Sequence, residues 1–155
     1  TFAIQIAKAL GAYVIAVSSD RNRQLVEALG ADEWLDYQAG DILRMSDPVN
    51  LFFDAFGNKN FQQAKPALLK GGTYVTTVPS PKAVVADLAT RFSPGKRCRL
   101  VVVKSKTRDL QWLAGQHEAG ALKAVIDSEW SLADIAKAQS QLETRRARGK
   151  LVIRP

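Results

Sequence analysis

Cysteine and histidine are nearly absent from this sequence. Cys98 and His117 are the only residues of their kinds. A disulfide within the chain is therefore impossible, and one Cys and one His together cannot supply the four ligands of a structural zinc site. Such sparse cysteine is compatible with a reducing compartment, and we expect a cytoplasmic location.

Long apolar runs and paired catalytic groups are also missing. No apolar stretch is long enough to cross a bilayer and no secretory signal is visible, so we expect no membrane partner. We find no pair of carboxylates at a spacing that suits acid–base catalysis. His117 lies between polar neighbours in a polar helix and is predicted to be exposed, and nothing marks Cys98 as a reactive thiolate. We therefore assign no catalytic and no metal-binding residue.

Acidic residues are outnumbered by basic ones. Lys and Arg number 22 against 15 Asp and Glu, which gives a net charge of +7 and favours an anionic partner. The one dense basic cluster comprises Arg145, Arg146, Arg148, Lys150 and Arg154. We interpret it as a solvated helix end, where cations suit the dipole. A nucleic-acid binder is the alternative, but no aromatic residues interleave with the cluster as single-strand binding requires, so we predict no nucleic-acid partner.

An apolar strand that stops in serines is the first positive feature. Residues 13–18 form a β-branched apolar run, which indicates a parallel strand covered on both faces. A helical pattern over 2–10 precedes it, with Phe2, Ile6 and Leu10 on one face, and a second over 22–29 follows it. Helix, buried strand, polar strand end and helix are half of a dinucleotide-binding unit.

The same alternation continues along the chain. Further strands are predicted at 31–37, 49–54, 73–78, 99–104, 122–126 and 149–154. Further helices are predicted at 61–69, 82–92, 107–118 and 132–142. Strands that alternate with helices predict an α/β fold with a doubly wound, mostly parallel sheet.

Six short motifs then make the chain recognisable. They are AIQIAKALGA at 3–12, LGAD at 29–32, DY at 36–37, FDAFG at 53–57, LKGG at 69–72 and GKLV at 149–152. In this order they resemble the C-terminal, cofactor-binding half of medium-chain dehydrogenases/reductases, in the quinone oxidoreductase-like branch of the zinc-binding dehydrogenase family. The resemblance covers nearly the whole chain and implies a Rossmann-type sheet.

Two parts of that family are not found in these residues. Its first strand and glycine-rich loop are expected just upstream of Thr1, as is the N-terminal catalytic domain that carries most substrate contacts and any zinc ligands. We therefore interpret 1–155 as a single truncated NAD(P)-binding domain, with 121–155 packing toward that catalytic domain. The missing strand belongs between 13–18 and 49–54. We expect either that it is present in the native molecule or that the gap is filled, by direct pairing of these two strands or by a strand donated by another copy.

The polar end of the first strand predicts cofactor choice. NAD-preferring Rossmann domains carry an acid there, which hydrogen-bonds the ribose hydroxyls. Here Ser18 and Ser19 take its place, and Arg21 and Arg23 are near enough in sequence to pair with a 2′-phosphate. This favours NADP(H), although Asp20 opposes it, and the four residues can also be read simply as a helix start with surface charges.

The resemblance adds four more cofactor-binding positions. It implies that Tyr37 lies against the adenine or the 2′-phosphate, although a strand-end tyrosine in solvent is an equal alternative. It implies that Gly57 allows backbone approach to the cofactor and that Val78 and Pro79 lie near the nicotinamide. All these positions follow strands, and open α/β sheets bind ligands at the carboxyl ends of their strands.

The function implied is an NADPH-dependent oxidoreductase of the quinone- or enone-reducing type, free of zinc. Its small-molecule substrate would be a quinone, an enone or an aldehyde, and the missing acid–base pair fits chemistry that the cofactor carries. The alternatives are the cofactor domain of a zinc-dependent alcohol dehydrogenase and a non-catalytic dinucleotide-binding scaffold. Three valines in the strand 99–104 would leave an exposed apolar edge, so we expect a homodimer through this strand.

Overall fold

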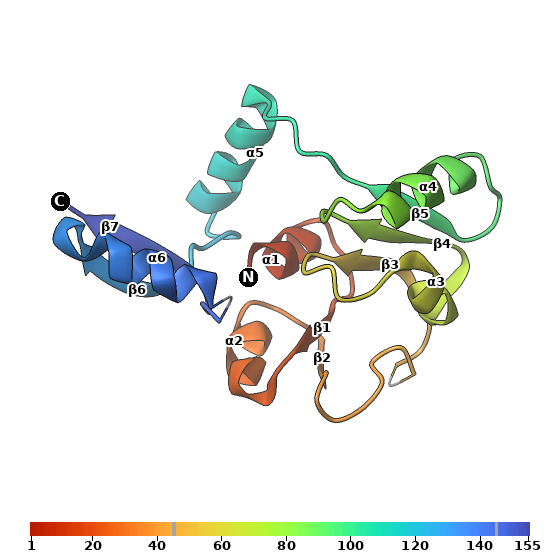
Figure 1. Cartoon of the computed structure of the whole chain (residues 1–155), viewed down its shortest axis with the longest axis horizontal. Coiled ribbons are helices and arrows are strands. Elements are labelled where there is room, and N and C mark those ends of the chain that lie inside the picture. Colours follow the sequence, from red (N-terminus) through yellow and green to blue (C-terminus); the bar gives the residue numbers. More distant parts are fainter. Residues whose placement is uncertain (45, 145) are drawn as a thin grey trace. The chain divides into compact units, whose positions relative to one another are not determined.

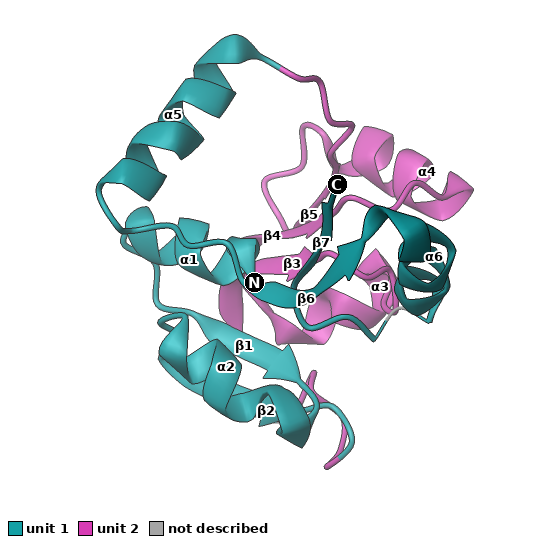
Figure 2. Ribbon diagram, turned by 90° about the vertical axis from the view of Figure 1, so that its left-hand side faces the viewer, with its two compact units in different colours: residues 1–38, 106–155 teal, residues 39–105 magenta. Residues whose placement is uncertain are grey.

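Two units make up the chain, and each has its own parallel sheets. The computed structural model describes residues 1–44, 46–144 and 146–155. One unit comprises 1–38 and 106–155, and the other comprises 39–105 (Figure 2). Arg145, which belongs to the predicted basic cluster, lies outside the described residues. Each unit is described below by itself.

The N-terminal part of the first unit confirms the predicted order of helix, strand and helix (Figure 1), but its first strand is not covered on both faces, because Val17 is 43% exposed. Helix α1 (Phe2–Ala9) is followed by β1 (Ile15–Ser18), the short helix η1 (Asp20–Asn22), α2 (Arg23–Ala28) and β2 (Glu33–Asp36). β1 and β2 pair in parallel, from Ile15 opposite Glu33 to Ser18 opposite Asp36. The apolar face predicted for α1 is only partly right, because Leu10 is 71% exposed and the buried residue of the helix is Gln5.

Gln5 explains where one predicted strand fails. Helix α5 (Thr107–Glu118) lies where it was predicted, but the strand expected at 122–126 begins only at Ile126. The Gln5 amide donates to the Lys123 carbonyl at 3.0 Å and accepts from its N–H at 2.8 Å, so a side chain takes the backbone groups that a strand partner would use. The strand β6 (Ile126–Ser131) then pairs in parallel with β7 (Lys150–Arg154), and η3 (Leu132–Asp134) and α6 (Ile135–Glu143) connect them.

A three-stranded parallel sheet forms the second unit, in the order β3-β4-β5. β3 (Val49–Asp54) agrees with the prediction, and α3 (Phe61–Ala64), η2 (Lys65–Ala67) and β4 (Leu68–Thr76) follow it. The helix predicted to reach residue 69 is too long, because Pro66 confines the next turn to a 3-10 helix and Leu68 already lies in the strand. The buried core comprises Phe61, Ala64, Leu68, Tyr74 and Cys98.

The edge strand of this sheet is shorter than predicted. After α4 (Pro81–Thr90), the strand β5 covers Arg97–Leu100 rather than 99–104. β4 ends at Thr76, whose carbonyl accepts from the Val101 N–H at 2.9 Å, and beyond that bond the ladder has no partner strand to continue on. Val101, Val102 and Val103 are 42%, 70% and 78% exposed. The apolar segment expected at the edge is therefore present, but not as a strand.

Every strand pair in the described residues is parallel, which confirms the predicted α/β class. The expected direct pairing of the two strands beside the missing one is wrong in the described part of the chain: β1 pairs only with β2, and β3 only with β4. β1 and β3 each keep one edge without a strand neighbour there. The parallel strands still bring their carboxyl ends, which hold the predicted site residues, to one edge of each sheet.

Candidate functional site

The end of β1 holds the predicted phosphate-binding residues. The Ser18 hydroxyl donates to the Ser19 carbonyl at 3.2 Å and accepts from Trp34 Nε1 at 2.9 Å, so its single proton is already used. Ser19 precedes η1, and its Oγ accepts a long bond of 3.4 Å from Asn22. Within the described residues, the Ser19 hydroxyl donates no hydrogen bond. Ser19, rather than Ser18, is the hydroxyl that can donate to an anion.

Arg23 opens helix α2 and lies against an aromatic side chain. Its guanidinium carbon is 5.0 Å from the centre of the Trp34 ring, and its Nε donates to Glu27 Oε1 at 2.9 Å. This hydrogen bond raises the pKa of Arg23 above its already high usual value. Both side chains of the ion pair are about half exposed, at 56% and 45%. The Arg23 fork is therefore charged, partly oriented by the ring and open to solvent.

Arg21, in η1, contacts the C-terminal basic cluster. Its Nη2 donates to the Arg146 carbonyl at 3.4 Å, and Arg148 Nη2 donates to the Arg21 carbonyl at 3.2 Å. Two segments more than 120 positions apart in sequence thus lie side by side at the start of η1. The cluster was predicted to be a solvated helix end, and its proximity to the strand end was missed. The density of arginine was the only signal in the sequence.

Tyr37 lies at the same edge of the β1–β2 sheet. It follows β2, its N–H donates to the Ser18 carbonyl at 3.4 Å, and 54% of the residue is exposed. The structure therefore brings together all five predicted residues of the first unit: Ser18, Ser19, Arg21, Arg23 and Tyr37. Their cationic and hydroxyl groups suit an exposed phosphate on a ribose.

The ends of β3 and β4 hold the remaining predicted residues. Gly57 has a φ of +83°, and a side chain there would meet Val78, whose Cγ1 lies 3.0 Å from the site of an added Cβ. The Val78 N–H donates to Thr76 Oγ1 at 3.1 Å, and Pro79 follows. Gly57 and Val78 are thus in contact, as residues on one edge of a sheet should be.

Asp54 organises this edge, and sequence reasoning missed its role. It is only 7% exposed, and it accepts hydrogen bonds from the N–H groups of Phe56, Gly57 and Lys59 and from the Tyr74 hydroxyl. The acid at the end of β3 is visible in the sequence. Its bond to Tyr74, on another strand, is not.

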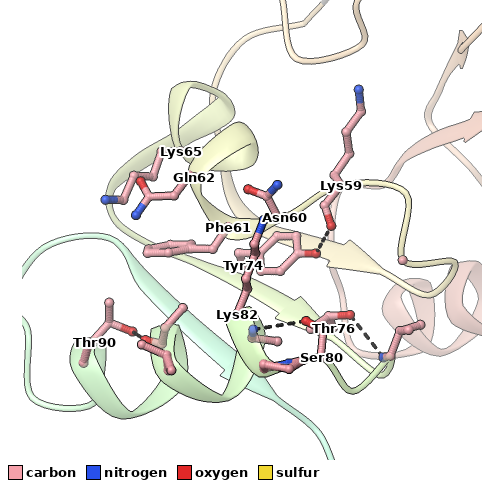
Figure 3. A pocket seen from close by; sticks show the side chains of 17 residues that line it. Lys59, Asn60, Phe61, Gln62, Lys65, Tyr74, Thr76, Ser80, Lys82 and Thr90 are labelled. Atoms are coloured by element: carbon pink, nitrogen blue, oxygen red, sulfur yellow. Dashed lines mark hydrogen bonds between the residues drawn. The ribbon is translucent and has the colours of Figure 1, made fainter.

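A groove of about 620 Å³ opens beside Gly57 and Val78 between α3 and α4. Apolar side chains that include Phe61, Val85 and Ala86 line it together with Tyr74 (Figure 3). Figure 3 also shows that the Lys59 side chain extends away from the Tyr74 ring while its carbonyl faces the Tyr74 hydroxyl. This groove provides apolar surface next to the strand ends.

The remaining candidates do not form a reactive centre. Cys98 is fully buried, and burial raises the pKa of its thiol. His117 is exposed, as predicted, and its Nδ1 lies 2.9 Å from the Leu122 carbonyl. Among residues 1–44, 46–144 and 146–155, no group of three or more His, Cys, Asp and Glu side chains fits a metal ion, and no helix is long and apolar enough to span a membrane.

Comparison with known proteins relates this geometry to a family. A family model described as zinc-binding dehydrogenase matches residues 29–153. The chloroplastic quinone-oxidoreductase QR1 of Triphysaria versicolor is 32% identical over 160 residues, which cover 99% of this chain and 48% of that protein. The trans-enoyl reductase pgmF of Aspergillus terreus is 29% identical, with coverage of 99% and 48%.

Solved structures agree with these sequence matches. The quinone oxidoreductase from Coxiella burnetii superposes with a TM-score of 0.85 at 29% identity, covering 99% of this chain and 48% of that one. A structure titled NAD-dependent alcohol dehydrogenase gives a TM-score of 0.78 at 27% identity, with coverage of 99% and 47%. The chain thus spans about half the length of the relatives it matches.

Proposed function

Because this chain belongs to the zinc-binding dehydrogenase family, we propose that it forms the cofactor-binding part of an NADPH-dependent oxidoreductase. The whole protein would pass a hydride to a quinone, an enone or an aldehyde. Relatives named as quinone oxidoreductases and an enoyl reductase support this substrate class. The described residues contain no group of three or more His, Cys, Asp and Glu side chains that fits a metal ion.

One observation carries the preference for NADPH. β1 ends in Ser18 rather than in a carboxylate, and Ser19, Arg21 and Arg23 follow it, with Asp20 as the one acid among them. An acid at this place would repel a 2′-phosphate, whereas a hydroxyl and two guanidinium groups can donate charge-assisted hydrogen bonds to it. Tyr37 lies beside them and supplies a face for the adenine or a hydroxyl for the phosphate.

The nicotinamide end of the proposed site consists of Gly57, Val78 and Pro79. When bound, the nicotinamide supplies the hydride, and these residues orient its ring. Gly57 has no side chain, so the cofactor can approach the backbone of this turn, and Val78 offers an apolar surface. Pro79 has no N–H and a restricted φ, which stiffens the loop after β4. The chain's contribution is binding and orientation, as expected where a cofactor carries the chemistry.

Domain organisation and assembly belong to the same proposal. We take 1–155 as a Rossmann-like domain whose segment 121–155 packs toward a catalytic domain. The exposed Val101, Val102 and Val103 beside the free edge of β5 support a homodimer through this edge. The buried lone cysteine supports a cytoplasmic location, although similar proteins are named as chloroplastic and as mitochondrial.

The test is quinone-dependent oxidation of NADPH by the full protein that carries these residues. We expect turnover with NADPH, and a lower kcat/KM with NADH. The 155-residue chain alone should not turn over, because the phosphate loop and the catalytic domain are not among its residues. Full protein that binds NADPH tightly but reduces no quinone, enone or aldehyde would favour the non-catalytic scaffold instead.

A further inference from the structure

Asp54 is a buried carboxylate whose bonding capacity is fully used. Oδ1 accepts from the N–H groups of Phe56 at 3.1 Å and Gly57 at 2.7 Å. Oδ2 accepts from the Lys59 N–H at 3.2 Å and the Tyr74 hydroxyl at 2.9 Å. A carboxylate accepts about four hydrogen bonds, so none of its capacity remains for a substrate proton. Asp54 therefore acts on the turn 55–59 and not on a reacting atom.

Tyr74 contacts both Asp54 and the carbonyl group of Lys59 in the same turn. It is only 2% exposed, and its ring packs against those of Phe52 and Phe61 with centroids 5.9 and 6.3 Å away. Its hydroxyl lies 2.7 Å from the Lys59 carbonyl (Figure 3) and 2.9 Å from Asp54 Oδ2, so its one proton is shared between these two acceptors. Burial and the neighbouring carboxylate raise the pKa of Tyr74 well above its usual range, so the hydroxyl keeps its proton. The turn 55–59 is thus held through three N–H groups and one carbonyl.

The turn 55–59 has little space for a side chain at its centre. Gly57 adopts a left-handed φ of +83°, and its missing Cβ would lie 3.0 to 3.1 Å from three carbon atoms of Val78. A small displacement of the turn therefore changes the contact between Gly57 and the loop after β4. These are the residues to which the proposed function assigns the nicotinamide.

We propose that Asp54, held by Tyr74, is the positioning residue for the nicotinamide end of the cofactor site. It keeps the turn 55–59 against Val78, so that the ring meets a preformed surface. This inference rests on the proposed function. It concerns only the unit 39–105, to which Asp54, Tyr74, Gly57 and Val78 all belong.

The variants Asp54→Asn and Tyr74→Phe test this in the full protein. In Asp54→Asn the amide can place its oxygen toward Phe56 and Gly57 and donate to the Tyr74 oxygen, so mainly the Lys59 N–H loses its acceptor. Tyr74→Phe keeps the packed ring and removes only the hydroxyl. Asp87→Asn is the matched control, because Asp87 is a carboxylate of the same unit that pairs with Arg99 away from the turn.

Calorimetric binding of two ligands gives the readout. NADPH carries the nicotinamide, whereas adenosine 2′,5′-bisphosphate lacks it. We expect the Kd for NADPH to rise about tenfold in both variants while the Kd for the bisphosphate and both values in Asp87→Asn stay unchanged. A purely structural role would weaken both ligands together.

The outcomes separate the two proposals. If the wild-type protein binds both ligands and the variants bind NADPH as tightly as it does, Asp54 has no positioning role. The same holds if the variants lose both ligands in equal proportion. If the wild-type protein binds neither ligand, the proposed function itself is wrong.

Discussion

The two groups of predicted cofactor-binding residues, the phosphate end in one unit and the nicotinamide end in the other, are built in opposite ways. At the phosphate end, Arg23 and Glu27 form an ion pair whose side chains are 56% and 45% exposed. At the nicotinamide end, Asp54 is 7% exposed, holds a turn through hydrogen bonds from three N–H groups and accepts a fourth bond from the Tyr74 hydroxyl. One end is an exposed group of charges, and the other is a buried network.

This difference predicts different behaviour on binding. An exposed i,i+4 ion pair contributes little to stability, so Arg23 can exchange Glu27 for a phosphate at little cost. A buried acceptor cannot be exchanged so easily, because each donor left without it costs about 1–3 kcal/mol. The phosphate end is therefore suited to selecting a cofactor by the charge of its phosphate. The nicotinamide end is suited to holding a fixed backbone geometry.

The largest effect should come from the core beneath the nicotinamide end. Leu68 is 2% exposed and lies in the buried cluster with Phe61 and Tyr74. Leu68→Ala should lower the free energy of unfolding by about 2–5 kcal/mol, because it leaves a cavity. Leu69→Ala, at a residue that is 41% exposed, is the control and should cost far less in the same urea titration. Equal losses would mean that the unit is not packed as described.

A side chain at Gly57 should have the next largest effect. Gly57→Ala introduces backbone strain at φ +83° and a clash with Val78, which together should cost about 2–4 kcal/mol of stability. Val78→Ala in the same chain removes two of the three close carbon atoms, leaves Cβ at 3.1 Å and does not relieve the backbone strain, so the double variant should recover only part of the loss. Full recovery in thermal and urea unfolding would show that the left-handed backbone costs nothing here.

Arg23→Ala tests the exposed end. The affinity for NADPH should fall by about 1–3 kcal/mol through the lost charge-assisted bond, while that for NADH stays the same. Arg108→Ala is the control, since Arg108 is an 85% exposed arginine on α5. If Arg23→Ala weakened NADH as strongly as NADPH, Arg23 would not read the 2′-phosphate.

The smallest effect concerns an exposed ion pair in the same unit as Arg23. Lys8 Nζ lies 2.8 Å from both Asp32 oxygens, and the Val14 N–H donates to Asp32 at 2.7 Å. The Lys8 bond first, and then the Val14 bond, lower the pKa of Asp32. A lowered pKa in the folded state stabilises the fold above the unfolded pKa, and this is lost as the pH falls through the folded value.

Comparison of the wild-type protein with Asp32→Asn measures this contribution. The difference in unfolding free energy should be constant near neutral pH and shrink as the pH falls below about 4. A difference that grew on acidification would mean that the Asp32 pKa is raised rather than lowered.

The sequence predicted what depends on local pattern. The α/β alternation, strand β3, helix α5 and the serines and arginines after β1 all follow from residues close together in the chain. It failed where distant residues compete for backbone groups. The Gln5 amide binds the backbone of Lys123, 118 positions away, and the predicted strand therefore starts later in the sequence. The buried bond between Asp54 and Tyr74 joins two strands, and Arg148 reaches Arg21 across 127 positions, so neither contact could be predicted from spacing.

The ratio of the Kd values for NADH and NADPH, measured by calorimetry on the full wild-type protein, tests the central claim most directly. The account predicts that NADPH binds more tightly at low salt. The preference for NADPH should shrink as added salt screens the exposed charges of Arg21 and Arg23. Equal affinity for the two cofactors at low salt would contradict the claim that the end of β1 selects a 2′-phosphate.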